Sequence, residues 1–230
     1  MKSILSLALL SSLGLWATAV GAWGIPETPP PSSSCGSSTF PATGQTTPAT
    51  GTLTHTGTIV RDDGVLKAGG ALSYQDNGDG TITDLNTGLM WEKKSMDGTD
   101  HDVTKAFVWS SPVTDTVWDW INAINTEVGN GIGFAGYNDW RLPNVKELQS
   151  IVDYGNHLPA VNLAFHNNES AGCTVLTCSA TASAAYWSST TIFTQPLGAW
   201  DVFFSSGVVF TDQKVNFNFV RAVRGGCVMP

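Results

Sequence analysis

The sequence predicts an α+β domain with two helices and a small, mainly antiparallel sheet. Apolar residues recur at helical spacing over residues 116–128 and 144–154, and strand-like alternation flanks both segments. Turn residues, chiefly Gly, Asn and Asp, separate the strand-like segments. Only 13% of the residues are charged, while Gly, Ser and Thr are abundant, a composition typical of an exported β-rich protein.

The second helical segment has the stronger start signal. Pro143 has a fixed φ that suits the start of a helix, Asn144 is a good N-cap, and Glu147 completes a capping box three residues on. Gly155 offers a stop at the other end. The first segment carries one apolar stripe and ends at the glycine-rich turn over residues 129–136.

Strand-like segments lie on both sides of the helices. Before them, we expect a hairpin that turns at residues 77–80, because Asn-Gly-Asp-Gly is a turn sequence, followed by a strand over residues 89–91. A turn at residues 205–207 predicts a second hairpin near the C-terminus. The strands expected after the helices are residues 185–191, 199–204, 208–211 and 217–224.

The N-terminal part predicts export. Residues 1–22 have the features of a secretory signal peptide, because Lys2 precedes an apolar core shorter than the ~20 residues of a membrane span. Residues 23–57 are rich in Pro, Ser, Thr and Gly, which predicts a disordered spacer in which Phe40 is suited to dock onto a core. The folded domain is expected over residues 58–230, in a secreted, periplasmic or cell-surface protein.

The charge of the chain limits its partners. Removing Lys2 with the signal leaves 10 basic and 19 acidic side chains, a net charge of about −9. A chain this acidic is not expected to bind nucleic acid or an anionic membrane surface. No membrane span is expected after signal cleavage. A polysaccharide, which binds through hydrogen bonds and stacking, or a surface protein remains as the partner.

Four cysteines follow the signal, and an even number in an exported protein predicts disulfides. Three pairings are open. We favour Cys173 with Cys178, which closes a small loop, and Cys35 with Cys227, which ties the two termini together. The spacing of these cysteines and of the histidines does not suit a zinc site.

Three blocks of the sequence carry a family resemblance. They are residues 76–91, which contain the Asn-Gly-Asp-Gly turn, residues 139–148, which contain Trp-Arg-Leu-Pro, and residues 186–224, which open on Tyr-Trp-Ser-Ser. In this order they resemble the Lcl C-terminal domain family of exported bacterial proteins. The resemblance implies a C-type-lectin-like fold, distantly similar to formylglycine-generating enzymes, and an association with adhesion and polysaccharide binding.

Asp76, Asp79 and Asp84 are candidate ligands for calcium, the one cofactor that the sequence suggests. Carboxylates at short spacing in a glycine-containing loop are typical of calcium sites. However, Gln75 and Asn86 occupy the first and twelfth positions, where an EF-hand-like loop needs carboxylates. The alternative is an Asx-rich hairpin turn without a metal.

The candidate ligand-binding residues combine aromatic rings with polar groups: Trp109, Asp139, Arg141, Trp187 and Trp200. Exposed Trp rings stack on sugar rings, whereas the alternative for each Trp is packing in or beside the core. The Arg141 guanidinium could bind a carboxylate or sulfate, and the alternative is that backbone carbonyls or Asp139 bind it.

The remaining chemistry is sparse. Residues 97–102 hold three carboxylates beside His101, and we expect a solvated loop rather than a shared cation. The sequence lacks a nucleophile elbow, a phosphate loop and a metalloprotease His pair. We therefore predict a non-catalytic binding or adhesion module for glycan or a surface partner. The alternatives are an enzyme on a formylglycine-generating-enzyme-like scaffold and a structural subunit of a surface assembly.

Overall fold

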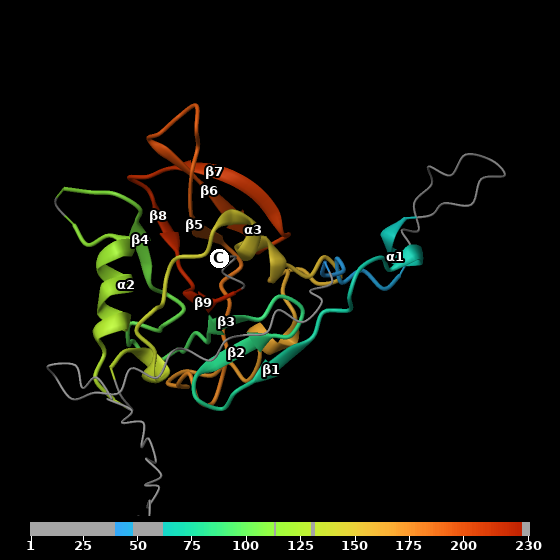
Figure 1. Cartoon of the computed structure of the whole chain (residues 1–230), viewed down its shortest axis with the longest axis horizontal. Coiled ribbons are helices and arrows are strands. Elements are labelled where there is room, and N and C mark those ends of the chain that lie inside the picture. The colour runs from blue at the N-terminus through green and yellow to red at the C-terminus, as the bar shows by residue number, and fades with distance from the viewer. Residues whose placement is uncertain (1–39, 48–61, 113, 130–131, 227–230) are drawn as a thin grey trace, which may run out of the picture. The chain divides into compact units, whose positions relative to one another are not determined.

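A computed structural model of the 230-residue chain describes residues 40–47, 62–112, 114–129 and 132–226. In these ranges the chain has an α+β fold with short helices and two mostly antiparallel sheets (Figure 1). The predicted α+β class is therefore confirmed. The predicted small sheet is replaced by two sheets of four and five strands.

The four-stranded sheet has the order β1-β2-β3-β9, with every neighbouring pair antiparallel. The hairpin predicted at residues 77–80 joins β1 to β2, and its turn needs Gly78 and Gly80 because both have positive φ. Met90 lies opposite Arg224, so the chain end pairs with β3. The strands are β1 (Tyr74–Asp76), β2 (Thr81–Asp84), β3 (Leu89–Glu92) and β9 (Val223–Gly225).

The five-stranded sheet has the order β4-β8-β5-β6-β7, and only the β5–β8 pair is parallel. The predicted C-terminal hairpin is confirmed as β6 and β7. The sequence did not predict β4, which is only three residues long. The strands are β4 (Ala106–Val108), β5 (Ala185–Thr191), β6 (Gly198–Phe203), β7 (Val208–Gln213) and β8 (Phe217–Phe219).

The single strand predicted over residues 217–224 is wrong, because the chain crosses from one sheet to the other within it. β8 belongs to the five-stranded sheet and β9 to the four-stranded sheet. Between them, the Arg221 side chain is fully buried and donates to the backbone carbonyls of Glu92 (2.7 Å) and Ala180 (2.5 Å). These hydrogen bonds hold the crossing segment in the interior.

Both predicted helices are present and both begin with a capping box. α2 (Val117–Thr126) is capped by Thr116, and α3 (Val145–Ser150) by Asn144. α3 ends earlier than predicted because Val152 leaves the helix and bridges Val161. The shorter helical turns are α1 (Asp63–Leu66), η1 (Phe134–Gly136) and η2 (Leu163–Phe165).

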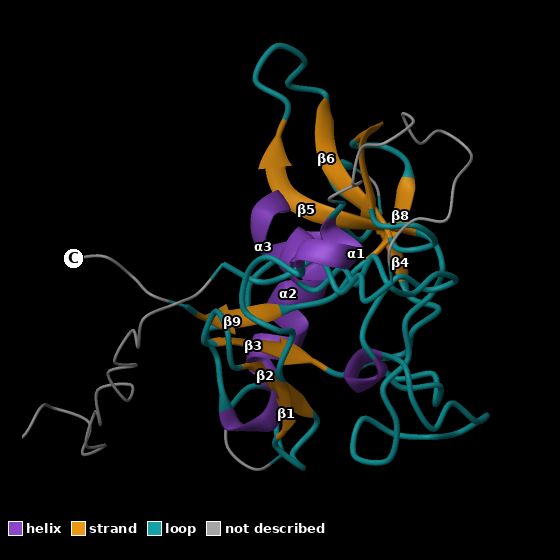
Figure 2. Cartoon of the chain, turned by 90° about the vertical axis from the view of Figure 1, so that its right-hand side faces the viewer, coloured by secondary structure: helices purple, strands orange, loops and turns teal. Residues whose placement is uncertain are grey.

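The core forms around the two main helices. α3 lies between the two sheets (Figure 2), and Leu148 packs in one cluster with Trp91 of β3 and Tyr186 of β5. Trp120 of α2 packs in a second cluster with Trp187 of β5. All five side chains are essentially excluded from solvent. Each fully buried apolar side chain of this kind stabilises the fold by about 1.5–3 kcal/mol.

Part of the predicted spacer belongs to the folded domain. Gly70 N–H donates to the Phe40 carbonyl (2.8 Å), Ala42 N–H donates to the Gly70 carbonyl (2.7 Å), and Tyr154 N–H donates to the Thr43 carbonyl (2.7 Å). The backbone thus docks, but the Phe40 side chain is 87% exposed and does not enter the core. We call residues 40–43 the N-terminal strap. The predicted signal and the rest of the spacer lie outside the described residues, apart from residues 44–47.

The loop over residues 97–102 is not the solvated loop expected from its charge. His101 and Asp102 are only 5% exposed. The Asp97 carboxylate accepts from Thr99 N–H (3.1 Å), and the Asp102 carboxylate accepts from Gly98 N–H (2.6 Å). Because the acidic side chains bind backbone within their own loop, the loop folds tightly and turns His101 inward.

The predicted disulfide between Cys173 and Cys178 is confirmed, with an S–S distance of 2.04 Å. Cys35 and Cys227 lie outside the described residues, so their pairing stays a prediction. Among the residues that the structure describes, there is no helix with the length and apolar character needed to cross a bilayer.

Candidate binding groove

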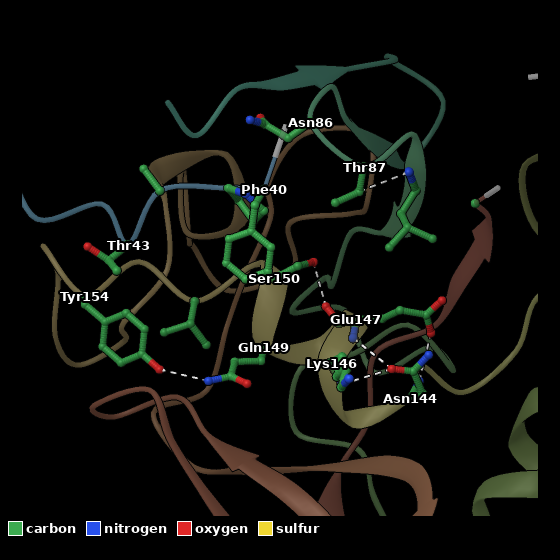
Figure 3. Close-up of a pocket in the computed structure, with 15 residues that line it drawn as sticks. Phe40, Thr43, Asn86, Thr87, Asn144, Lys146, Glu147, Gln149, Ser150 and Tyr154 are labelled. Atoms are coloured by element: carbon green, nitrogen blue, oxygen red, sulfur yellow. Dashed lines mark hydrogen bonds between the residues drawn. The ribbon is translucent and has the colours of Figure 1, made fainter. Parts of the chain in front are cut away.

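A groove with a volume of about 840 Å³ lies beside α3 (Figure 3). The N-terminal strap forms one wall, the β2–β3 turn at Asn86 and Thr87 another, and the exposed side of α3 a third. Gly226, the last described residue, also lines it. We call this the α3 groove. Three segments that are distant in the sequence therefore build one concave surface.

The capping box of α3 fixes the position of the groove's polar wall. The Asn144 side-chain oxygen accepts from the N–H groups of Lys146 (2.9 Å) and Glu147 (3.0 Å), and a Glu147 carboxylate oxygen accepts from Asn144 N–H (2.8 Å). Arg141 donates to both carboxylate oxygens of Glu147 at 2.7 Å. This bidentate pair holds the first turn of α3 and thereby directs Lys146 and Gln149 to the groove.

Two aromatic rings belong to the groove. The Phe40 side chain on the strap is 87% exposed, and the Tyr154 side chain after α3 is 38% exposed. The Tyr154 hydroxyl donates to the Gly207 carbonyl (3.0 Å) and accepts from the Gln149 amide (3.3 Å). Its ring is therefore held in place, in part by the hydrogen bond to Gln149 drawn in Figure 3, while part of its surface stays open to solvent.

Several polar groups in the groove retain hydrogen-bonding capacity. Among the described residues, no side chain pairs with the Lys146 ammonium, the Asn144 side-chain NH₂ or the Gln149 side-chain oxygen. Thr87, in contrast, donates its hydroxyl to Asp84 (2.7 Å). The groove thus offers unused donors and an unused acceptor beside exposed rings, and it can bind a ligand that has both hydroxyl groups and apolar faces.

Each of the three candidate calcium ligands accepts a hydrogen bond from the backbone N–H two residues further along the chain. Asp76 accepts from Gly78 N–H (2.9 Å), Asp79 from Thr81 N–H (3.0 Å), and Asp84 from the N–H of Asn86 (2.9 Å). This arrangement matches the Asx-rich turn that the sequence offered as the alternative. The described residues contain no group of three or more His, Cys, Asp or Glu side chains that could hold a metal ion. The calcium site stays a prediction.

Asp76 has a further partner in Lys93, whose ammonium lies 2.7 Å from its carboxylate. Burial raises the pKa of Asp76, but the hydrogen bonds from Lys93 and Gly78 outweigh it and hold the pKa below its ordinary value. A cation at this carboxylate would have to displace the lysine.

Asp139 and Arg141 join the start of α3 to β9. Asp139 pairs with Arg224 (2.6 Å), whose guanidinium lies 3.8 Å from the centre of the Tyr137 ring. Arg141 pairs with Glu147 and also donates to the Gly225 carbonyl (3.2 Å). Both candidate residues thus have intramolecular partners. Arg141 does not line the groove but contacts Glu147, which does.

The three candidate tryptophans lie outside the α3 groove. Trp187 is fully buried and donates its ring N–H to the Phe107 carbonyl, so it packs in the core and has no surface open to a ligand. The Lys214 ammonium lies 3.8 Å from the centre of the Trp109 ring, and the Trp118 ring packs against Trp109 in a T-shaped arrangement. Trp200 on β6 is partly exposed. Trp109 and Trp200 stay candidates for a second stacking surface.

The sequence reasoning missed the residues that line the groove. Phe40 stood out as a large apolar residue in a polar segment, but it was expected to dock onto a core and not to line a groove. Lys146 and Gln149 occupy the solvent-facing side of an amphipathic helix, where polar residues carry no signal by themselves. Tyr154 lies at the predicted end of that helix. Only the folded structure brings these side chains together.

The profile of the Lcl C-terminal domain family matches residues 80–224, which is more than half of the chain. The chain therefore belongs to the Lcl C-terminal domain family. The match includes the groove residues on β3 and α3, whereas the N-terminal strap lies before it. No curated protein matches the chain.

Proposed function

We propose that this chain is an exported, non-catalytic binding module with a C-type-lectin-like domain, and that the α3 groove binds a glycan. The signal-like N-terminus and the Cys173–Cys178 disulfide support export to an oxidising compartment. Membership of the Lcl C-terminal domain family is compatible with this role.

One observation carries the proposal: two exposed aromatic rings, Phe40 and Tyr154, lie in one groove with unused polar groups. A sugar ring has apolar faces that stack on aromatic side chains and hydroxyl groups that need donors and acceptors. Lys146 and Asn144 supply donors, and Gln149 supplies an acceptor. A volume of about 840 Å³ is large enough for two or three sugar units.

The test is a glycan array probed with the chain from Trp23 onward, with and without calcium. Two variants make a matched pair, because both remove an exposed phenyl ring without opening the core. Phe40→Ala removes a ring from the groove, whereas Phe193→Ala removes a 95% exposed ring from the β5–β6 loop. We expect the wild type and Phe193→Ala to bind the same glycans, and Phe40→Ala to lose about tenfold in affinity, about 1.4 kcal/mol.

If the wild type binds no glycan on the array, with or without calcium, the proposed glycan binding is wrong. If the wild type, Phe40→Ala and Phe193→Ala bind equally well, the α3 groove is not the binding site. Binding that requires calcium would instead support the predicted site at Asp76, Asp79 and Asp84.

A second candidate function is a structural subunit of a surface assembly. Three large apolar side chains are mostly exposed at one end of the five-stranded sheet: Phe193 (95%), Leu197 (79%) and Val215 (66%). Their two loops are joined by a hydrogen bond from Lys214 N–H to the Leu197 carbonyl (2.9 Å). An exposed apolar patch of this kind suits a protein contact. Light scattering of the wild type against Phe193→Ala tests whether this patch mediates self-association.

No observation in the described residues favours the enzyme alternative. Glu147, the carboxylate of the groove, binds Arg141 and caps α3. The predicted Cys35–Cys227 disulfide lies outside the described residues, and peptide mapping without reduction tests it.

A further inference from the structure

His101 bridges two carboxylates with its two ring nitrogens. Its Nδ1 lies 2.7 Å from Oε1 of Glu92, and its Nε2 lies 3.0 Å from Oε2 of Glu127. Glu92 ends β3, and Glu127 follows the last residue of α2. The imidazole therefore connects a strand to the C-terminal end of a helix.

The bridge runs from the interior to the surface. The Glu92 side chain is fully buried and the His101 side chain is 6% exposed, whereas the Glu127 side chain is 47% exposed. Glu92 also accepts from the Lys94 ammonium (3.0 Å) and from Ala222 N–H (2.8 Å). The inner end of the bridge is thus fixed by several partners, and the outer end depends on His101.

Three charged side chains face His101. Glu92 is the last residue of β3, Lys94 lies two residues further on, and Glu127 directly follows α2. The fourth neighbour is uncharged: the ring of Phe134, from η1, lies with its centre 4.0 Å from the centre of the imidazole. The two carboxylates therefore outnumber the single ammonium.

The geometry depends on the protonation of the ring. A neutral imidazole has one N–H donor and one lone-pair acceptor, so it can donate to only one of the two carboxylates. The other nitrogen would then direct a lone pair at a carboxylate oxygen. An imidazolium donates to both. While both carboxylates are ionised, both observed contacts are satisfied together only when His101 is positively charged.

We propose that Glu92, His101 and Glu127 form a pH-sensitive latch that ties the C-terminal end of α2 to β3. The latch is closed while the imidazole carries two protons. On deprotonation, the contact with the deeply buried Glu92 persists and the contact with the exposed Glu127 is lost.

The direction of the pH effect follows from the surroundings. Burial lowers the pKa of His101, but the hydrogen bond and charge of Glu92, with the hydrogen bond to Glu127, raise the pKa above its ordinary value. The stabilisation from the latch is therefore fully present below about pH 6.5, the value for an unfolded histidine, and is lost as the pH rises through the higher pKa of the folded protein.

The first test is an NMR titration of the histidine ring protons. The wild-type His101 should titrate above about pH 6.5. Glu127→Gln removes the outer charge and should lower the midpoint by about 0.5 pH units, a roughly threefold weaker proton affinity. Glu169→Gln is the control, because Glu169 pairs with a different histidine, His166, and its loss should leave the His101 midpoint unchanged.

The second test is amide hydrogen exchange in the last turn of α2, corrected for the intrinsic effect of pH. In the wild type, protection of residues 123–126 should fall about threefold across the His101 titration. In Glu127→Gln the protection of these residues should be low across the whole pH range and should not change as His101 titrates. The latch would be overturned by a wild-type His101 titration midpoint at or below about pH 6.5. It would also be overturned if the hydrogen-exchange protection of residues 123–126 did not change as His101 titrates.

Discussion

Two polar clusters of this molecule differ in how far their hydrogen-bonding groups are used. In the cluster around Glu92, the carboxylate accepts from Lys94, His101 and a backbone N–H, and all three side chains are buried. In the α3 groove, Lys146 and Gln149 keep unused groups that face solvent. Polar groups with every partner in place hold a fold together, whereas unused ones beside exposed rings are available to a ligand.

The difference extends to charge. Burial raises the pKa of Glu92, but Lys94 and His101 together lower it below its ordinary value, so the interior retains an anion. Such a group is strongly coupled to its partners, and its removal leaves other charges uncompensated. Substitutions in the two clusters should therefore affect different properties. Loss of a group in the first cluster should mainly lower stability, and loss of an unused group in the second should mainly weaken binding.

The largest expected effect is that of Glu92→Gln. The substitution leaves the buried Lys94 ammonium without its counter-ion and removes one end of the His101 bridge. We expect the free energy of unfolding to fall by about 3–5 kcal/mol, measured by urea denaturation at pH 6. A loss below about 1 kcal/mol would show that the cluster is not the closed network described above.

Asp201→Asn should have the next largest effect, with the opposite sign. Burial, together with the charge of Asp212, raises the pKa of Asp201 to about 6. Since the folded value exceeds that of an unfolded Asp, ionisation destabilises the folded protein. The Asn variant should be more stable by up to about 3 kcal/mol above pH 6, and this gain should vanish below about pH 4. Thermal unfolding across this range checks both parts, and a pH-independent difference would contradict the assignment.

Asn144→Ala tests the frame of the groove. It removes a side chain that accepts from two backbone N–H groups at the start of α3. We expect a loss of about 1 kcal/mol in the free energy of unfolding, typical of an N-cap. Thermal unfolding measures it. An unchanged stability would mean that the Arg141–Glu147 pair alone holds the first turn of α3.

The smallest effect on stability is expected for Lys146→Ala and Gln149→Ala. Both side chains are exposed, so the free energy of unfolding should change by less than about 0.5 kcal/mol. Glycan affinity should nevertheless fall about threefold to tenfold, because each loses a group that faces the groove. Lys105→Ala, which removes a lysine outside the groove, is the matched control. Calorimetric titration measures affinity, and a similar loss in the control would indicate a nonspecific charge effect.

The elements that the sequence predicted correctly depend on residues near one another in the chain. The hairpin at residues 77–80 follows from four consecutive turn residues, and the start of α3 from Asn144 and Glu147 three positions apart. Two of the errors involve distant partners. The strand over residues 217–224 divides because Arg221 is bound by carbonyls of two other segments, and α3 stops early because Val152 pairs with Val161.

The candidate site was less predictable than the fold for the same reason. Asp139 and Arg141 were chosen as polar residues of a recognisable block, but their partners, Arg224 and Glu147, make them part of the frame. The groove arises where the strap at Phe40 docks beside α3, through backbone hydrogen bonds to Gly70 and Tyr154. These partners are distant from the strap in the chain, so a local pattern of residue types does not predict the contact.

The most direct test of the proposed groove is a two-dimensional NMR titration with the oligosaccharide that binds best on the array. We expect the amide shifts to concentrate in residues 40–43, in the β2–β3 turn and in α3, and to weaken in Phe40→Ala but not in Phe193→Ala. Shifts concentrated around Trp109 or Trp200, with none in α3, would contradict it.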